Sequence, residues 1–119
     1  MSLQCVLVAE DEMIIGVDLC DTVQEAGFVV DGPYDTARSA IDSLEKHKPD
    51  LAILDVRLDD GEVYPLADRL IAANVPVIFH SGEVAPRDVA ARYPDALALA
   101  KPCPPDQIIA KMHEALAAA

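Results

Sequence analysis

The sequence predicts an α/β fold, with one doubly wound domain in which helices cover both faces of a parallel sheet. The chain has 119 residues, of which 52% are hydrophobic, and this suits a single buried core. Short, continuously apolar runs alternate with longer amphipathic stretches along the chain. A run that is apolar at consecutive positions is typical of a strand covered on both faces, as strands are in a parallel sheet.

The apolar runs predict five strands, at residues 5–9, 28–30, 51–54, 75–79 and 96–100. A helix is expected after each strand, over residues 13–26, a stretch beginning near 36, 63–73, 87–93 and 105–117. Gly27 suits the C-cap of the first helix, and Asp35 or Thr36 suits the N-cap of the second. The last helix carries Ile108, Ile109, Met112 and Leu116 at helical spacing.

Five strands in strict alternation with five helices imply a parallel sheet between two helical layers. Right-handed crossovers leave few topologies, and the flavodoxin-like order 2-1-3-4-5 is the commonest for this set of elements. In such a sheet a ligand lies beyond the carboxyl ends of the strands, where strands 1 and 3 are neighbours.

Composition excludes several classes of protein. Acidic residues number 21 against 9 basic ones, and the formal charge of −12 disfavours direct contact with nucleic acid. Apolar runs stay far below the roughly 20 residues that a membrane-spanning helix needs. The three cysteines, at positions 5, 20 and 103, fit neither a disulfide framework nor a zinc site. We therefore expect a cytoplasmic protein without membrane contact.

Polar residues follow four of the predicted strands directly. They are Glu10-Asp11-Glu12 after the first strand, Asp55 after the third, His80-Ser81-Gly82 after the fourth and Lys101-Pro102 after the fifth. Each alone has a structural interpretation, as a helix cap, a turn or a surface lysine. These structural interpretations do not explain why the residues converge at one sheet edge, because clustered carboxylates repel one another unless a cation joins them.

The chemistry of this group favours a hard divalent cation. Oxygen ligands without His or Cys suit Mg²⁺, with Mn²⁺ as an alternative. A carboxylate beside such an ion, with an ammonium and a hydroxyl nearby, is equipped to attack a phosphoryl group. The product would be an aspartyl phosphate.

Four segments, Val8–Glu12, Ile53–Val56, Val77–Gly82 and Ala100–Pro102, resemble the receiver domain of two-component response regulators, the CheY-like superfamily. The resemblance spans residues 1–119 as one receiver domain. It implies that Asp55 is the phosphoacceptor, that Ser81 hydrogen-bonds the phosphoryl group and that Lys101 forms an ion pair to it. It further implies that Mg²⁺ binds Asp55, Asp11, Glu10 (largely through water) and the backbone carbonyl of Arg57. The Lys101–Pro102 bond is often cis in this family.

The chain departs from the family pattern at several positions. Ala98 stands where an aromatic residue usually changes position on activation, and Ser81 replaces the commoner Thr. Asp59 replaces a usual Pro. Arg57 and Glu83 border the expected path of the attacking water, either as an ion pair that slows dephosphorylation or as two solvated side chains.

The resemblance implies a phosphorylation-activated signalling switch. A histidine kinase or phosphotransfer protein would donate a phosphoryl group to Asp55, and the signal would pass to a downstream protein target by contact. Catalysis would be confined to the domain's own phosphotransfer and autodephosphorylation. Two alternatives remain open: a receiver-like docking domain that no longer switches, which Ala98 favours, and a small Mg²⁺-dependent phosphohydrolase. The sequence also leaves open a stand-alone receiver or one excised from a longer protein.

Overall fold

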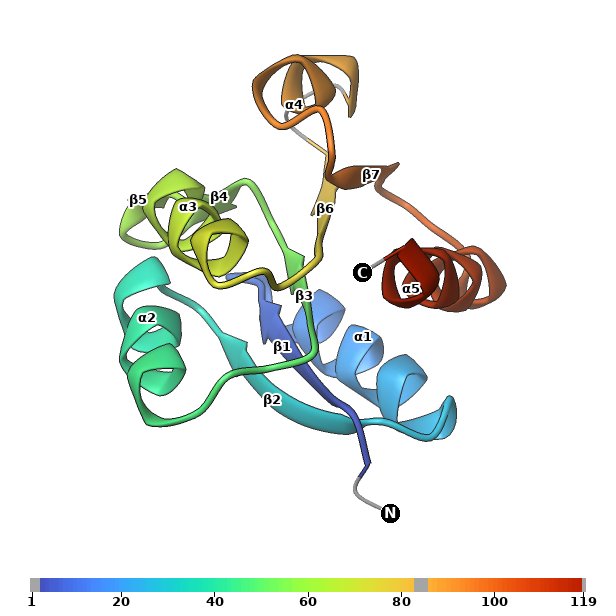
Figure 1. Cartoon of the computed structure of the whole chain (residues 1–119). Coiled ribbons are helices and arrows are strands. Elements are labelled where there is room, and N and C mark those ends of the chain that lie inside the picture. The colour runs from blue at the N-terminus through green and yellow to red at the C-terminus, as the bar shows by residue number, and fades with distance from the viewer. Residues whose placement is uncertain (1–2, 83–85, 119) are drawn as a thin grey trace.

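The computed structural model describes residues 3–82 and 86–118, and within them the predicted parallel sheet is confirmed (Figure 1). Its strands are β1 (Cys5–Ala9), β2 (Val29–Tyr34), β3 (Leu51–Leu54), β6 (Val77–Ser81) and β7 (Leu97–Ala100). The spatial order β2-β1-β3-β6-β7 is the predicted 2-1-3-4-5 order counted over the sheet strands. The chain thus has the flavodoxin-like doubly wound topology.

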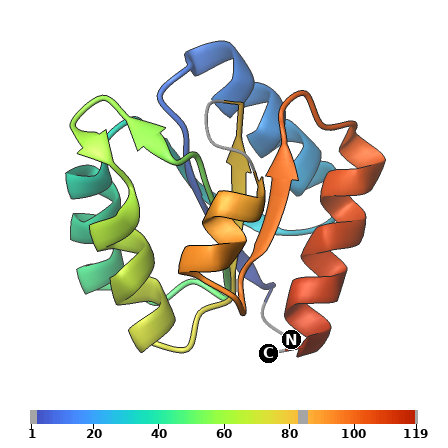
Figure 2. The ribbon, with the colours of Figure 1, turned by 90° about the horizontal axis from the view of Figure 1, so that it is seen from above.

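The predicted helices are present, and they divide into two layers. They are α1 (Met13–Glu25), α2 (Ala37–Lys46), α3 (Tyr64–Ala72), α4 (Pro86–Arg92) and α5 (Pro105–Ala118). α1 and α5 lie on one face of the sheet, whereas α2 and α3 lie on the other (Figures 1 and 2). Two apolar clusters correspond to these faces: Leu19 and Ile108 belong to the first cluster, Leu66 and Val89 to the second. The apolar residues of the strands and helices therefore form two cores, one on each side of the sheet.

The structure shows which residues cap the end of α1 and the start of α2. The C-cap residue of α1 is Ala26, not the predicted Gly27, which follows it with φ 98°, the left-handed conformation in which a glycine commonly ends a helix. At the start of α2 the capping residue is Thr36, whose hydroxyl accepts a hydrogen bond from the Ser39 N–H at 3.1 Å. Asp60, 23 residues away from Ala37, adds a second cap, since its carboxylate accepts from the N–H of Ala37 at 2.8 Å.

Three elements differ from the sequence prediction. β2 runs to Tyr34, past the predicted end at residue 30, because it continues beside β1 through an irregularity in the pairing register. β6 begins at Val77 and extends through Ser81, because its ladder continues into buried polar residues. A short antiparallel hairpin, β4 (Arg57–Leu58) and β5 (Gly61–Glu62), precedes α3 and was not predicted.

Two expectations drawn from composition concern the cysteines and membrane-spanning helices. All three cysteines are free, as their spacing predicted. Among the described helices, none combines the length and the apolar character that crossing a membrane requires.

Candidate functional site

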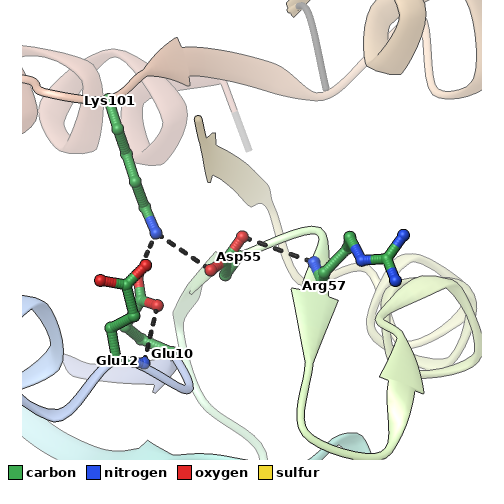
Figure 3. A network of polar contacts seen from close by, with 5 residues as sticks. All are labelled: Glu10, Glu12, Asp55, Arg57 and Lys101. Atoms are coloured by element: carbon green, nitrogen blue, oxygen red, sulfur yellow. Dashed lines mark hydrogen bonds and ion pairs between the residues drawn. The ribbon is translucent and has the colours of Figure 1, made fainter. Parts of the chain in front are cut away.

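The carboxyl ends of β1, β3 and β7 bring charged side chains from distant parts of the sequence together (Figure 3). Glu10 follows β1 and Asp55 follows β3, and these strands are parallel neighbours with Ala9 paired to Leu54. The Asp55 N–H donates to the Ala9 carbonyl at 2.9 Å, so the sheet ladder holds the two carboxylates side by side. Lys101 follows β7, and its N–H donates to the carbonyl of Ser81 at 3.2 Å.

The ammonium of Lys101 joins the two carboxylates. Its Nζ lies 2.6 Å from Oε1 of Glu10 and 3.0 Å from Oδ2 of Asp55. The three side chains are largely buried, with 13%, 1% and 9% of the Lys101, Glu10 and Asp55 side chains exposed. Buried charges are stable only when they are paired, and breaking such a pair leaves an uncompensated charge. Lys101 therefore stabilises an otherwise repulsive pair of acids.

The protonation of Glu10 is strongly affected by this setting. The pKa of Glu10 is raised from 4.5 to about 7, with burial as the largest cause; the hydrogen bond from Lys101 opposes this rise and Asp55 adds to it. Burial lowers the pKa of Lys101, but its bonds to Glu10 and Asp55 outweigh burial and raise that pKa overall. The site thus holds a permanently charged lysine beside one carboxyl group that titrates near neutrality.

Three carboxylates at this edge form a donor set for a cation. Glu10, Asp11 and Asp55 each offer an oxygen, and these oxygens lie within 4.8 Å of one another. An oxygen-only set with several negative charges suits a small hard divalent ion, since the ion offsets the repulsion among the acids. The residues present therefore fit a magnesium-type site.

The remaining predicted site residues lie around this group. Ser81 is the buried last residue of β6. The N–H of Arg57 donates a long hydrogen bond of 3.4 Å to Oδ1 of Asp55, and its guanidinium points away from the carboxylates in Figure 3. The Lys101–Pro102 peptide bond is cis, as the resemblance implies. The pairing of Arg57 with Glu83 concerns a residue outside the described part of the chain.

An aromatic cluster occupies the region next to Ala98, where the sequence lacks the usual aromatic residue. Ala98 pairs across the sheet with Phe79, whose ring stacks on Tyr93 at 5.3 Å between centroids. Tyr93 also contacts Tyr64 at 5.7 Å, and its hydroxyl donates to Asp68 at 2.8 Å. Sequence reasoning missed this cluster, although three of the chain's five aromatic residues lie in it.

Two residues that the sequence already placed at this edge, Glu12 and His80, have contacts that it did not predict. The Glu12 N–H donates to Oε2 of Glu10 at 3.2 Å, which orients that carboxylate. His80, on β6, is buried, and burial together with the charge of Lys101 lowers its pKa. The apolar pattern of the strand gave no signal for either contact, because both depend on how the loops after β1 and β7 fold back.

A doubly wound parallel sheet with an acidic group and a lysine at its carboxyl edge defines the receiver class of signalling domain. The family described as the response regulator receiver domain matches residues 6–113, and the chain belongs to it. The curated relative described as transcriptional regulatory protein PdtaR of Mycobacterium tuberculosis is 33% identical over 95 residues, which cover 80% of this chain. The match covers 46% of that relative, so this chain spans about half its length.

Solved structures share the fold. A response regulator receiver protein from Sinorhizobium medicae WSM419 is 27% identical with a TM-score of 0.88, and the match covers 98% of this chain and 97% of that one. A CheY-like receiver domain protein from Methanospirillum hungatei JF-1, with a TM-score of 0.87 and coverage of 98% and 96%, is 22% identical and shows the fold alone.

Proposed function

We propose that this domain is a phosphorylation-activated switch, in which Asp55 accepts a phosphoryl group from a histidine kinase or a phosphotransfer protein. The observation that carries the proposal is the position of Asp55, which shares Lys101 with Glu10 at the carboxyl edge of the sheet. A carboxylate held beside a fixed cation is suited to nucleophilic attack on phosphorus. In the transfer an oxygen of Asp55 forms a P–O bond while the P–N bond of the donor phosphohistidine breaks and its imidazole leaves.

Neighbouring groups would stabilise the charge that the phosphoryl group brings. Lys101 would pair with one phosphoryl oxygen, and the Ser81 hydroxyl would donate a hydrogen bond to another. Glu10, Asp11, Asp55 and the backbone carbonyl of Arg57 would hold Mg²⁺, with Mn²⁺ as a substitute. The bound ion would supply positive charge that offsets the phosphoryl oxygens.

The donor would approach the site over the start of α1. Met13 and Ile14 follow directly after the acidic segment, and 69% and 79% of these residues are exposed. Exposed apolar side chains beside a reactive group favour a protein partner over a small polar substrate. We therefore propose a protein phosphodonor, and a downstream target that recognises the phosphorylated state through protein contact.

A second function, a docking domain that no longer switches, is favoured by Ala98. The aromatic side chains near it, Phe79 and Tyr93, are already packed against each other. In this alternative the acidic site would remain without controlling the recognition surface.

Incubation with acetyl phosphate and Mg²⁺, followed by intact-protein mass spectrometry, tests these functions. We expect a stable mass gain of one phosphoryl group in the presence of Mg²⁺ and none when EDTA replaces it. Absence of a gain under both conditions would favour the docking domain. Continuous release of phosphate at high turnover, without an accumulated phosphoprotein, would indicate a phosphohydrolase.

The raised pKa of Glu10 makes the effect of Mg²⁺ depend on pH. Because folding raises this pKa from 4.5 to about 7, the folded protein holds the proton more tightly, and stability without metal declines as pH rises through that window. Above it Glu10 is ionised and can ligate Mg²⁺. We expect Mg²⁺ to raise the melting temperature clearly at about pH 8 and weakly at about pH 5.5.

Differential scanning fluorimetry with and without Mg²⁺ at both pH values measures this effect. Glu10→Gln should diminish the metal effect at the higher pH, whereas Glu25→Gln, on the exposed part of α1, should leave it unchanged. An equal metal effect at both pH values in the wild type would contradict the prediction.

A further inference from the structure

A cavity of about 540 Å³ lies between α1 and α5, on the face of the sheet that these helices cover. Ile15 and Leu19 of α1 and Ile108 of α5 give it apolar walls. Its volume falls within the range of pockets that enclose small organic molecules, roughly 300–1,000 Å³. The proposed phosphotransfer involves the nearby carboxylates and leaves this cavity without a role.

His80 lines the cavity from the sheet side and is an unusual residue to find there. It is 5% exposed, and neither ring nitrogen has a hydrogen-bond partner among the described residues. Buried polar groups are nearly always paired, because leaving one unpaired costs free energy. A neutral imidazole presents one N–H donor and one acceptor nitrogen, so a bound group could pair with either. This ring points to a ligand with a hydrogen-bonding group.

The charges around the cavity select the sign of such a ligand. Glu12, the residue before α1, and Asp18 of α1 both line it, and both are exposed. Lys101 also lines it, but its ammonium is engaged by Glu10 at 2.6 Å and by Asp55 at 3.0 Å. The chain as a whole carries a formal charge of −12. An organic cation is therefore attracted to this cavity and an anion is repelled.

We propose that the cavity binds a small amphipathic organic cation, with a hydrogen-bonding group at the end remote from its charge. The apolar body would pack on Ile15, Leu19 and Ile108, the charge would lie near Glu12 and Asp18, and the remote group would pair with His80. The juxtaposition of an unpartnered buried imidazole, apolar walls and two carboxylates carries this assignment. The proposal concerns the unphosphorylated domain and does not depend on phosphotransfer to Asp55.

Three probes of one size test the required chemistry in the ¹⁵N-labelled, unphosphorylated domain by NMR titration. Tyramine has a phenol, an aromatic body and an ammonium; phenethylamine lacks the hydroxyl; 4-hydroxyphenylacetate replaces the cation with an anion. We expect saturable amide shifts at Leu19, His80 and Ile108 with tyramine. Phenethylamine should bind roughly threefold to tenfold more weakly, because it cannot pair with His80. The anion should give no saturable shifts.

Matched variants separate binding in the cavity from binding to the acidic surface in general. Asp18→Asn should weaken tyramine binding about threefold, whereas Asp21→Asn, the same charge change at an exposed position of α1 outside the cavity lining, should leave it unchanged. His80→Leu should remove the advantage of tyramine over phenethylamine. The Asp18 and Asp21 pair keeps the test informative even when the His80 variant fails to fold.

Several outcomes would overturn the proposal. They are the absence of saturable shifts with either amine, equal binding of the anion, and equal effects of the Asp18 and Asp21 substitutions. Shifts confined to the exposed Met13 and Ile14 would place the amine on the surface of α1 instead, and would equally reject the cavity as its site.

Discussion

Asp55→Asn is expected to abolish the stable mass gain that acetyl phosphate and Mg²⁺ produce in the wild type. The amide of Asn lacks the ionised oxygen that would attack phosphorus, and it cannot form an acyl phosphate. The variant should still fold, because Lys101 keeps its 2.6 Å ion pair with Glu10 and one of the clustered negative charges is removed. Loss of phosphorylation in a folded protein would therefore locate the chemistry at this residue.

The acidic character of the surrounding loop calls for a matched control. Asp59→Asn removes an equal charge from an exposed turn between β4 and β5, and we expect it to retain the mass gain. Intact-protein mass spectrometry of both variants, with circular dichroism to verify folding, gives the comparison. A phosphoryl group retained by folded Asp55→Asn would exclude Asp55 as the sole acceptor and would move the search to other carboxylates.

The site could be predicted from the sequence where it depends on strand order alone. Glu10 and Asp55 directly follow apolar runs, and parallel strands place their carboxyl ends at one edge. Lys101 is contributed by the far edge strand, and its arrival between the two acids depends on the path of a side chain across the sheet end. Sequence patterns predict the register of the backbone, but they do not predict which atoms a long side chain such as Lys101 contacts.

Long-range polar contacts could not be predicted for a similar reason. Asp60 caps α2 from a hairpin that follows β3, and its sequence context, Asp-Asp-Gly, indicated only an acidic loop. The strand β2 was predicted too short because its second half contains Asp31, Gly32 and Pro33, which break the apolar pattern. In each case tertiary contacts outweighed local propensity.

The packing around Ala98 gives a physical interpretation of the missing aromatic residue at this position. Ala98 lies opposite Phe79 in the ladder, and Phe79 is two residues before Ser81 on the same face of β6. Phe79 stacks on Tyr93, which follows α4. A change at Ser81 would therefore reach α4 through neighbours on one strand, without an aromatic side chain on β7.

Gly32→Ala is expected to be the most destabilising of the glycine substitutions in this domain. Gly32 has φ 130°, and a Cβ added there would lie 2.4 Å from the carbonyl oxygen of Val8 on the adjacent strand β1. That oxygen belongs to the backbone of Val8, which is fully buried, and cannot move away cheaply. We expect a loss of at least about 4 kcal/mol, a large share of the stability of a typical domain.

Gly61→Ala is the matched control, because it separates the clash from the backbone conformation. Gly61 has φ 124°, similar to Gly32, yet nothing lies within 4 Å of the added Cβ. Its substitution should cost about 1–2 kcal/mol from conformation alone. Urea unfolding followed by circular dichroism measures both, and equal losses would show that β1 moves to accommodate the methyl group.

The clash at Gly32 also affects the functional site, because β1 leads into Glu10, whose N–H donates to the carbonyl of Tyr34 at 2.8 Å. A shift of either strand would therefore displace the carboxylate that Lys101 holds.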